Sequence, residues 1–210
     1  MKILLVHDWG QAAKQYLFLT KEPRYHISLY EFPGFGACPV KYTNKILYGF
    51  AVDLRECLCE HRFDMIVACG MGCNVLMRAV QGLQRPSKLV LVNPTLGGVP
   101  KLRAKLLAVS LLQLRSVRRD LDRKYDLSTE NSNVEVLINS LHELAFDTWK
   151  QVMLPKGTKV YRGECDEFID RLSVGDEVIP GMGHSALQYI RDIIMKEVFL
   201  WECSTDYQQS

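Results

Sequence analysis

The sequence predicts an α/β fold with a mostly parallel sheet of five or six strands, flanked by helices and interrupted by a helical insertion. Short aliphatic runs, each closed by polar residues or glycine, alternate along the chain with segments of helical periodicity. This alternation is typical of a parallel sheet with helices on both faces. With 210 residues, 48% of them hydrophobic, the chain has enough apolar material for one domain with a substantial core.

Six runs are expected to form strands: 2–7, 25–32, 63–69, 88–92, 158–162 and, more weakly, 177–179. The first run is apolar until it reaches Asp8 and Gly10, which is typical of a buried parallel strand. The fourth run stops at Asn93 and Pro94. Helices are expected between the strands, at 41–61, 74–83 and 185–201.

A long segment between the fourth and fifth predicted strands departs from this rhythm. In it Leu107, Leu111 and Leu114 recur with a period of about 3.6 residues, which predicts a helix with one apolar face. A second helix is expected at 134–152. We therefore expect residues 99–154 to form a helical lid, with the three leucines facing a substrate, inserted into a core of residues 1–98 and 155–210.

The third predicted strand leads into a tight turn and then a helix, which is the layout of a nucleophile elbow. This turn needs small residues two positions before and two positions after the nucleophile, and Ala68 and Gly72 fill those positions. Gly70 then stands where a reactive serine is expected. If Cys69 or Cys73 were the nucleophile instead, larger residues would crowd the turn, so a catalytic thiol is the less favoured interpretation.

Four segments resemble motifs of the α/β-hydrolase family. Residues 6–10 (VHDWG) are similar to its oxyanion loop and residues 32–36 (FPGFG) to its Pro-Gly turn. Residues 160–166 (VYRGECD) resemble the strand that carries the acid, and residues 179–185 (IPGMGHS) resemble the histidine loop. The order of elbow, acid and histidine is also that of the family. The first two segments weakly resemble the carboxylesterase of biotin synthesis.

This resemblance implies a role for each matching residue. His184 would be the general base, and Asp166 would orient its imidazole. The backbone N–H groups of Trp9 and Met71 would form the oxyanion hole. Gly70 would occupy the nucleophile position without supplying a nucleophile.

The sequence departs from the family pattern at three places. It begins at the strand that carries the oxyanion loop, so the two strands that precede it in the family are absent from the given sequence. Asp8 replaces the usual glycine of that loop. The pair Asp8 and Trp9 resembles the nucleophile of haloalkane dehalogenases, but it follows the wrong strand for that role, so this interpretation is discounted. The elbow lacks its serine, which removes the usual source of an acyl-enzyme.

Basic residues of the insertion suggest a possible partner. Arg115, Arg118, Arg119 and Arg123 recur at helical spacing, and a solvated helix face is the favoured interpretation. The alternative is docking of an anionic partner, either coenzyme A or an acyl carrier protein. The resemblance implies no cofactor, and no metal site is expected.

Composition limits the remaining classes of function. The net charge of +2 gives no general attraction to nucleic acid, and no apolar stretch is long enough to span a bilayer. The seven cysteines show no metal-binding spacing, so a cytoplasmic chain with free thiols is expected.

Three functions remain open from the sequence. The first is a hydrolase of a carboxylic ester or thioester whose activity is lost or impaired by Gly70. The second is a non-catalytic pseudoenzyme that binds a ligand or protein. The third is proton abstraction by His184 and Asp166 without a nucleophile, as in a lyase or oxygenase.

Overall fold

The computed structural model describes residues 1–83, 88–95, 119, 122–123, 127–146, 154–168 and 177–206. Its strands form one parallel six-stranded sheet in the order β2-β1-β3-β4-β5-β6. The strands are β1 (Lys2–Val6), β2 (His26–Tyr30), β3 (Met65–Cys69), β4 (Lys88–Val92), β5 (Lys159–Gly163) and β6 (Glu177–Ile179). The predicted fold class is confirmed, and all six predicted strands are present.

The described helices are η1 (Ala13–Lys21), α1 (Ile46–Glu60), α2 (Met71–Ala79), η3 (Thr129–Asn131), α6 (Val134–Ala145) and α7 (Ile190–Asp206). The helix expected at 41–61 begins only at Ile46, where the Glu143 carboxylate accepts hydrogen bonds from the backbone N–H groups of Ile46 and Leu47 at 2.8 and 2.9 Å. The helix expected from residue 74 already begins at Met71, directly after Gly70. The helix expected from residue 185 begins at Ile190, and η1 was not among the predicted elements.

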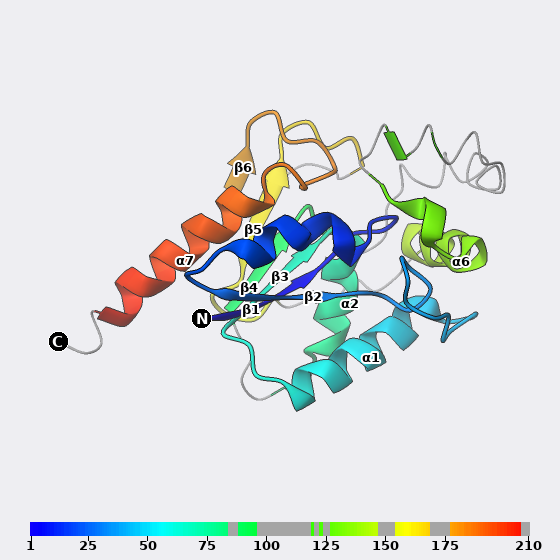
Figure 1. Cartoon of the computed structure of the whole chain (residues 1–210), viewed down its shortest axis with the longest axis horizontal. Helices are drawn as coiled ribbons and strands as arrows, with labels where there is room; N and C mark the ends of the chain where they lie inside the picture. Colours follow the sequence, from blue (N-terminus) through cyan, green and yellow to red (C-terminus); the bar gives the residue numbers. More distant parts are fainter. Residues whose placement is uncertain are drawn as a thin grey trace.

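Each face of the sheet is covered by its own layer of helices (Figure 1). Side chains of β1 alternate between the layers, with Leu4 and Val6 on one face and Ile3 and Leu5 on the other. The first face packs against α1, α2 and α6, and the second packs against η1 and α7. This two-sided burial explains why the strands read as continuous apolar runs.

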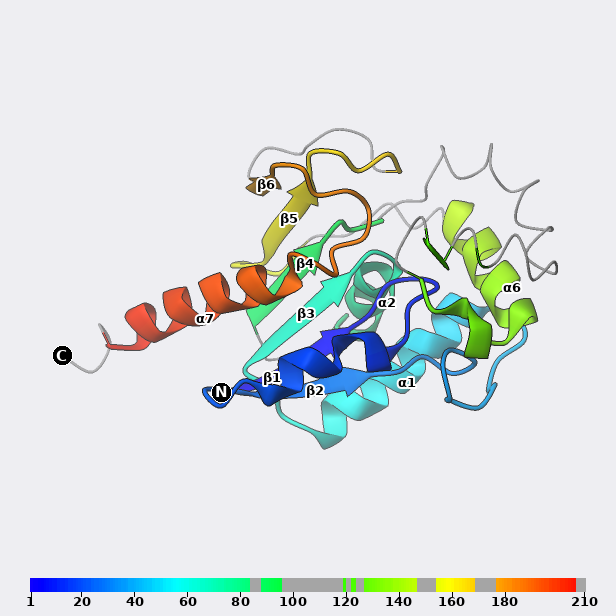
Figure 2. The same cartoon turned by 45° about the horizontal axis from the view of Figure 1, so that its top comes forward.

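Helix α6 lies beyond the carboxyl ends of the strands, which are the arrowheads in Figure 2. Its Val136, Leu137 and Leu141 join the same core as α1. Residues 134–145, within the predicted lid range, therefore pack into the core. Leu107, Leu111 and Leu114 lie outside the described residues, so the lid and the domain boundaries stay predictions.

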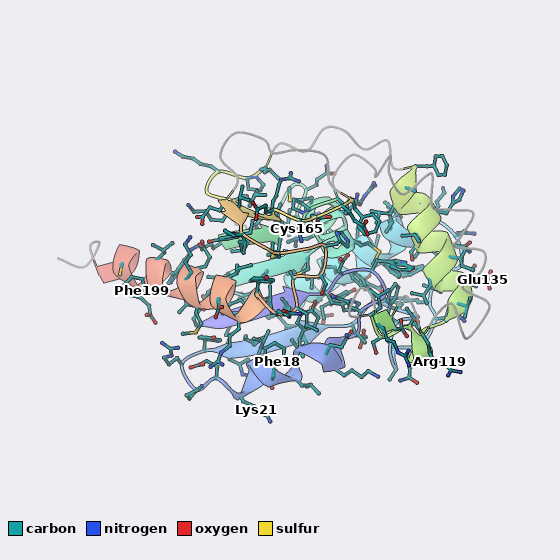
Figure 3. The ribbon with its side chains drawn as sticks, turned by 90° about the horizontal axis from the view of Figure 1, so that it is seen from above. Phe18, Lys21, Arg119, Glu135, Cys165 and Phe199 are labelled. Atoms are coloured by element: carbon teal, nitrogen blue, oxygen red, sulfur yellow. The ribbon has the colours of Figure 1, made fainter. Side chains whose placement is uncertain are left out.

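The opposite end of the molecule carries the N-terminus and the end of α7 (Figures 1 and 2). There α7 runs past the edge of the sheet, and Phe199 points away from the body with 64% of its surface exposed (Figure 3). Deeper in the same helix, Glu197 is fully buried and pairs with Lys88, whose Nζ lies 2.6 Å from Glu197 Oε2. The Tyr161 hydroxyl donates to the other carboxylate oxygen. No described helix is long and apolar enough to cross a membrane.

Candidate active site

The turn after β3 has the backbone of a nucleophile elbow. Gly70 has φ +48° and ψ −116°, a combination that side-chain-bearing residues rarely adopt. Its N–H donates to Val92 O at 2.9 Å, and its carbonyl accepts from the Thr95 hydroxyl at 3.1 Å. A Cβ on Gly72 would lie 2.6 Å from His7 O, so α2 starts too close to the end of β1 for a larger residue.

The structure brings His184 and Asp166 together at the carboxyl ends of the strands. His184 Nδ1 lies 3.0 Å from Asp166 Oδ2 and 3.2 Å from Oδ1. The Asp166 carboxylate also accepts from Phe168 N at 2.9 Å, and the Phe168 ring packs edge-on against the imidazole. These contacts fix the orientation of the His184 ring.

Asn93, directly after β4, positions the histidine loop. Its side-chain amide donates to Gly183 O and His184 O, both at 2.9 Å, and its Oδ1 accepts from Gly163 N at 2.7 Å. One side chain thus ties the end of β5 to the loop that carries the imidazole. The sequence assigned no function to Asn93, although a polar residue at the carboxyl end of a buried strand was a visible signal.

The backbone N–H groups of Trp9 and Met71 converge on a single oxygen, and that oxygen belongs to Asp8. Asp8 Oδ1 accepts from Met71 N at 2.6 Å and from Trp9 N at 2.7 Å. Asp8 Oδ2 lies 3.1 Å from His184 Nε2. The chain's own carboxylate therefore occupies the predicted oxyanion hole and contacts the second nitrogen of the predicted base.

Gly70 and Asp8 depend on each other sterically. A Cβ placed on Gly70 would overlap Oδ1, Cγ and Oδ2 of Asp8, closer than any non-bonded contact allows. The carboxylate thus fills the room that a side chain at the elbow would need. The absence of a side chain at residue 70 thus makes room for the carboxylate of residue 8. The sequence did not reveal this relation, because the two residues lie on different loops.

Charge reinforces the contact between Asp8 and His184. Burial lowers the pKa of His184, but the Asp8 charge and the hydrogen bonds that His184 donates to both carboxylates outweigh it and raise that pKa to about 10. Burial raises the pKa of Asp8, but the His184 charge and hydrogen bonds from His184, Met71 and Trp9 bring it below its ordinary value. At neutral pH the pair is a carboxylate and an imidazolium.

Neither cysteine beside the elbow is suited to nucleophilic attack. Cys69 is 2% exposed, and Cys73 is fully buried and donates its thiol to Ala68 O. Burial raises the pKa of both thiols, so both stay protonated at neutral pH.

The remaining predicted site residues are placed only in part. The Trp9 indole donates to Leu137 O at 3.0 Å and so ties the first loop to α6. Arg119 and Arg123 are exposed, and Figure 3 shows Arg119 at the same end of the molecule as Glu135 of α6. Arg115 and Arg118 lie outside the described residues. Among the described residues no cluster of histidine, cysteine and carboxylate side chains could hold a metal ion.

Solved structures share this fold. The chain is similar to an esterase from Exiguobacterium antarcticum, with 12% identity over 96% of this chain and 91% of that one and a TM-score of 0.74. It is similar to a serine-to-glycine mutant of the N-acyl homoserine lactonase AidH complexed with N-hexanoyl homoserine lactone (12% identity, 99% and 91% coverage, TM-score 0.70). It is also similar to YbtT, a type II thioesterase of the yersiniabactin pathway (13% identity, 94% and 91% coverage, TM-score 0.62).

No protein-family model and no curated protein matches the sequence. At these identities the structural likeness shows the fold alone. The chain has the α/β-hydrolase fold, as the four sequence motifs predicted.

Proposed function

We propose that this chain is an acyl-hydrolase scaffold, of the kind that acts on carboxylic esters or thioesters, in which hydrolysis through an acyl-enzyme is blocked. The position of the Asp8 carboxylate carries this proposal. Acyl-enzyme chemistry needs a nucleophile on the elbow and two free N–H donors for the oxyanion. Gly70 supplies no nucleophile, and Asp8 Oδ1 takes both donors.

The other two functions can be weighed against the same contacts. A nucleophile-free mechanism needs His184 as a neutral base, but the two flanking carboxylates keep it protonated at neutral pH. The geometry therefore disfavours that mechanism. A binding role remains the second candidate, because the lactonase mutant shows that a serine-to-glycine variant of this fold can hold a lactone.

The similar solved structures support an acyl substrate for this scaffold, but they give no support for a protein or coenzyme A partner. They are an esterase, a lactonase complexed with an acyl homoserine lactone, and a thioesterase. A small acyl group is thus the substrate class that we propose for this scaffold. Docking of coenzyme A or an acyl carrier protein on Arg115, Arg118, Arg119 and Arg123 stays a prediction, as does a cytoplasmic location.

The simplest repair, Gly70→Ser alone, is not expected to restore hydrolysis. It assumed that the oxyanion donors were free, but a serine side chain introduced at the elbow would collide with the Asp8 carboxylate. The matching repair is the pair Asp8→Gly and Gly70→Ser, which removes the carboxylate and supplies the attacking hydroxyl together.

The test uses four proteins: the unmodified chain, each single variant and the double variant. We expect only the double variant to be labelled by a fluorophosphonate and to show a burst with p-nitrophenyl butyrate. Adding His184→Ala to the double variant should abolish the burst while the fold is retained by circular dichroism. Equal labelling of Gly70→Ser alone would contradict the blocking role of Asp8, and a burst from the unmodified chain would overturn the proposal.

A further inference from the structure

We propose that a cavity at the amino ends of the strands binds a small aromatic carboxylate, with the Arg62 guanidinium as its anion-binding group. The cavity is separate from the candidate active site, where Asp8, Gly70 and His184 lie at the carboxyl ends of the strands. The inference therefore goes beyond the proposed function and does not depend on it.

The cavity has a volume of about 640 Å³ and lies where α1 ends and where β3 and β4 begin. Its lining includes Leu58 near the end of α1, Asp64 directly before β3, and Lys88, the first residue of β4. Trp201 of α7 lines it as well. The strand starts are the ends away from the arrowheads in Figure 2. Because small-molecule sites have volumes of roughly 300–1,000 Å³, this cavity is large enough for a ligand.

Apolar side chains form one part of the lining: Leu58, Phe63, Ile66, Val80, Leu83 and Trp201. Ile66 and Val80 are buried members of the core beneath α1 and α2. Leu58, Phe63 and Leu83 pack against that core and keep part of their surface exposed. Transfer of apolar surface out of water would stabilise the apolar body of a ligand here, and the rings of Phe63 and Trp201 favour a flat aromatic one.

Charge singles out Arg62 among the polar residues of the lining. The Asp64 carboxylate accepts a hydrogen bond from Lys2 N at 2.7 Å. Lys88 Nζ lies 2.6 Å from Glu197 Oε2 and donates to Glu197 O at 3.0 Å. Arg62 is exposed, and its guanidinium has no hydrogen-bond or ion-pair partner among the residues that the structure describes. It therefore offers the cavity a permanent positive charge that no carboxylate of the described chain neutralises.

The shape and charge of these groups select a carboxylate. A planar guanidinium can donate two parallel hydrogen bonds to a carboxylate, and one charge balances the other. A dianionic phosphate would keep a surplus negative charge in a cavity that Asp64 also lines. The His61 ring, another part of the lining, meets the Phe63 ring edge-on with centroids 6.4 Å apart. Since these two rings flank Arg62 in the sequence, neighbouring residues can bind the aromatic body and its carboxylate together.

The binding test compares 2-naphthoate with 2-naphthamide, which has the same rings but no charge. Isothermal titration calorimetry of the unmodified chain should show saturable binding of 2-naphthoate, at least about tenfold tighter than that of the amide, because hydrogen bonds between charged groups contribute more than neutral ones. Arg62→Gln should lose most of this difference. The matched control is Arg191→Gln, which removes an exposed arginine of α7 that lies 3.6 Å from Glu22 and outside the cavity lining, and it should bind 2-naphthoate like the unmodified chain.

Cys59 can report where the ligand binds, because it lines the cavity and is exposed. Cys165, labelled in Figure 3, is also exposed and follows β5 at the other end of the sheet. We expect 2-naphthoate to slow the alkylation of Cys59 by iodoacetamide and to leave that of Cys165 unchanged, as measured by peptide mass mapping. In Arg62→Gln the same concentration should give little protection.

Three results would overturn the inference. Absence of saturable binding would mean that the cavity is not a site for this class of ligand. Equal affinity of the unmodified chain and Arg62→Gln would mean that the guanidinium is not the anion-binding group. Protection of Cys165 instead of Cys59 would place the ligand at the candidate active site. None of these results bears on the blocked acyl-enzyme, which is tested by the Asp8→Gly, Gly70→Ser variant.

Discussion

Two buried carboxylates, Glu197 of α7 and Asp8 at the carboxyl ends of the strands, each lie beside a cation but are held in different ways. Glu197 is fully buried and contacts the side chains of Lys88 and Tyr161. Asp8 is fixed by two backbone N–H groups and touches a histidine whose side chain is 19% exposed. Glu197 is thus held by side chains within the core, whereas Asp8 is held by main-chain donors at the candidate active site.

The largest effect is expected at the Glu197 pair. Lys88→Met keeps the length of the side chain but leaves Glu197 buried without its cation, which should lower the free energy of unfolding by about 3–5 kcal/mol. Urea denaturation followed by circular dichroism measures this loss. The combined Lys88→Met, Glu197→Leu variant is the control and should recover most of it; equal loss in both would show that the ion pair is not the cause.

A smaller effect is expected from Gly70→Ala, which tests the steric link between Gly70 and Asp8. The new Cβ would displace the Asp8 carboxylate from its donors and add strain at φ +48°, at a cost of about 2–4 kcal/mol. In the Asp8→Gly background only the strain remains, so the cost, measured by urea denaturation, should fall to roughly 1–2 kcal/mol. Equal costs in the two backgrounds would mean that the two residues are independent.

The smallest effect is the pH dependence of stability. The folded-state pKa of His184 is raised from 6.5 to about 10, so its stabilising contribution is complete below about pH 6.5 and is lost as pH rises toward 10. Between pH 6.5 and 9 the unmodified chain should lose stability, by on the order of 1–3 kcal/mol. In Asp8→Asn the free energy of unfolding, measured by urea denaturation at each pH, should change less with pH. An equal pH dependence in both proteins would argue against the charge pair of Asp8 and His184.

Sequence patterns predicted the local features of the chain, but they did not predict the contact between the loop after β1 and the loop after β3. The alternation of apolar runs predicted all six strands of the described residues, and the small residues Ala68 and Gly72 predicted the elbow, because both features depend on nearby residues. The order of the motifs also predicted that Asp166 and His184 would lie within hydrogen-bonding distance of each other, as they do. The Asp8 carboxylate could not be placed in this way, since its position depends on how closely the loop after β1 approaches the loop after β3.

The state of the Asp8 and His184 pair can be read directly from the imidazole nitrogens. Nitrogen-15 NMR of the unmodified chain should show His184 protonated on both nitrogens at pH 8, with titration near pH 10. In Asp8→Asn the same signal should titrate substantially lower, because the charge beside Nε2 is gone. A His184 that titrates near pH 6.5 in both proteins would contradict the placement of the Asp8 carboxylate in the oxyanion hole.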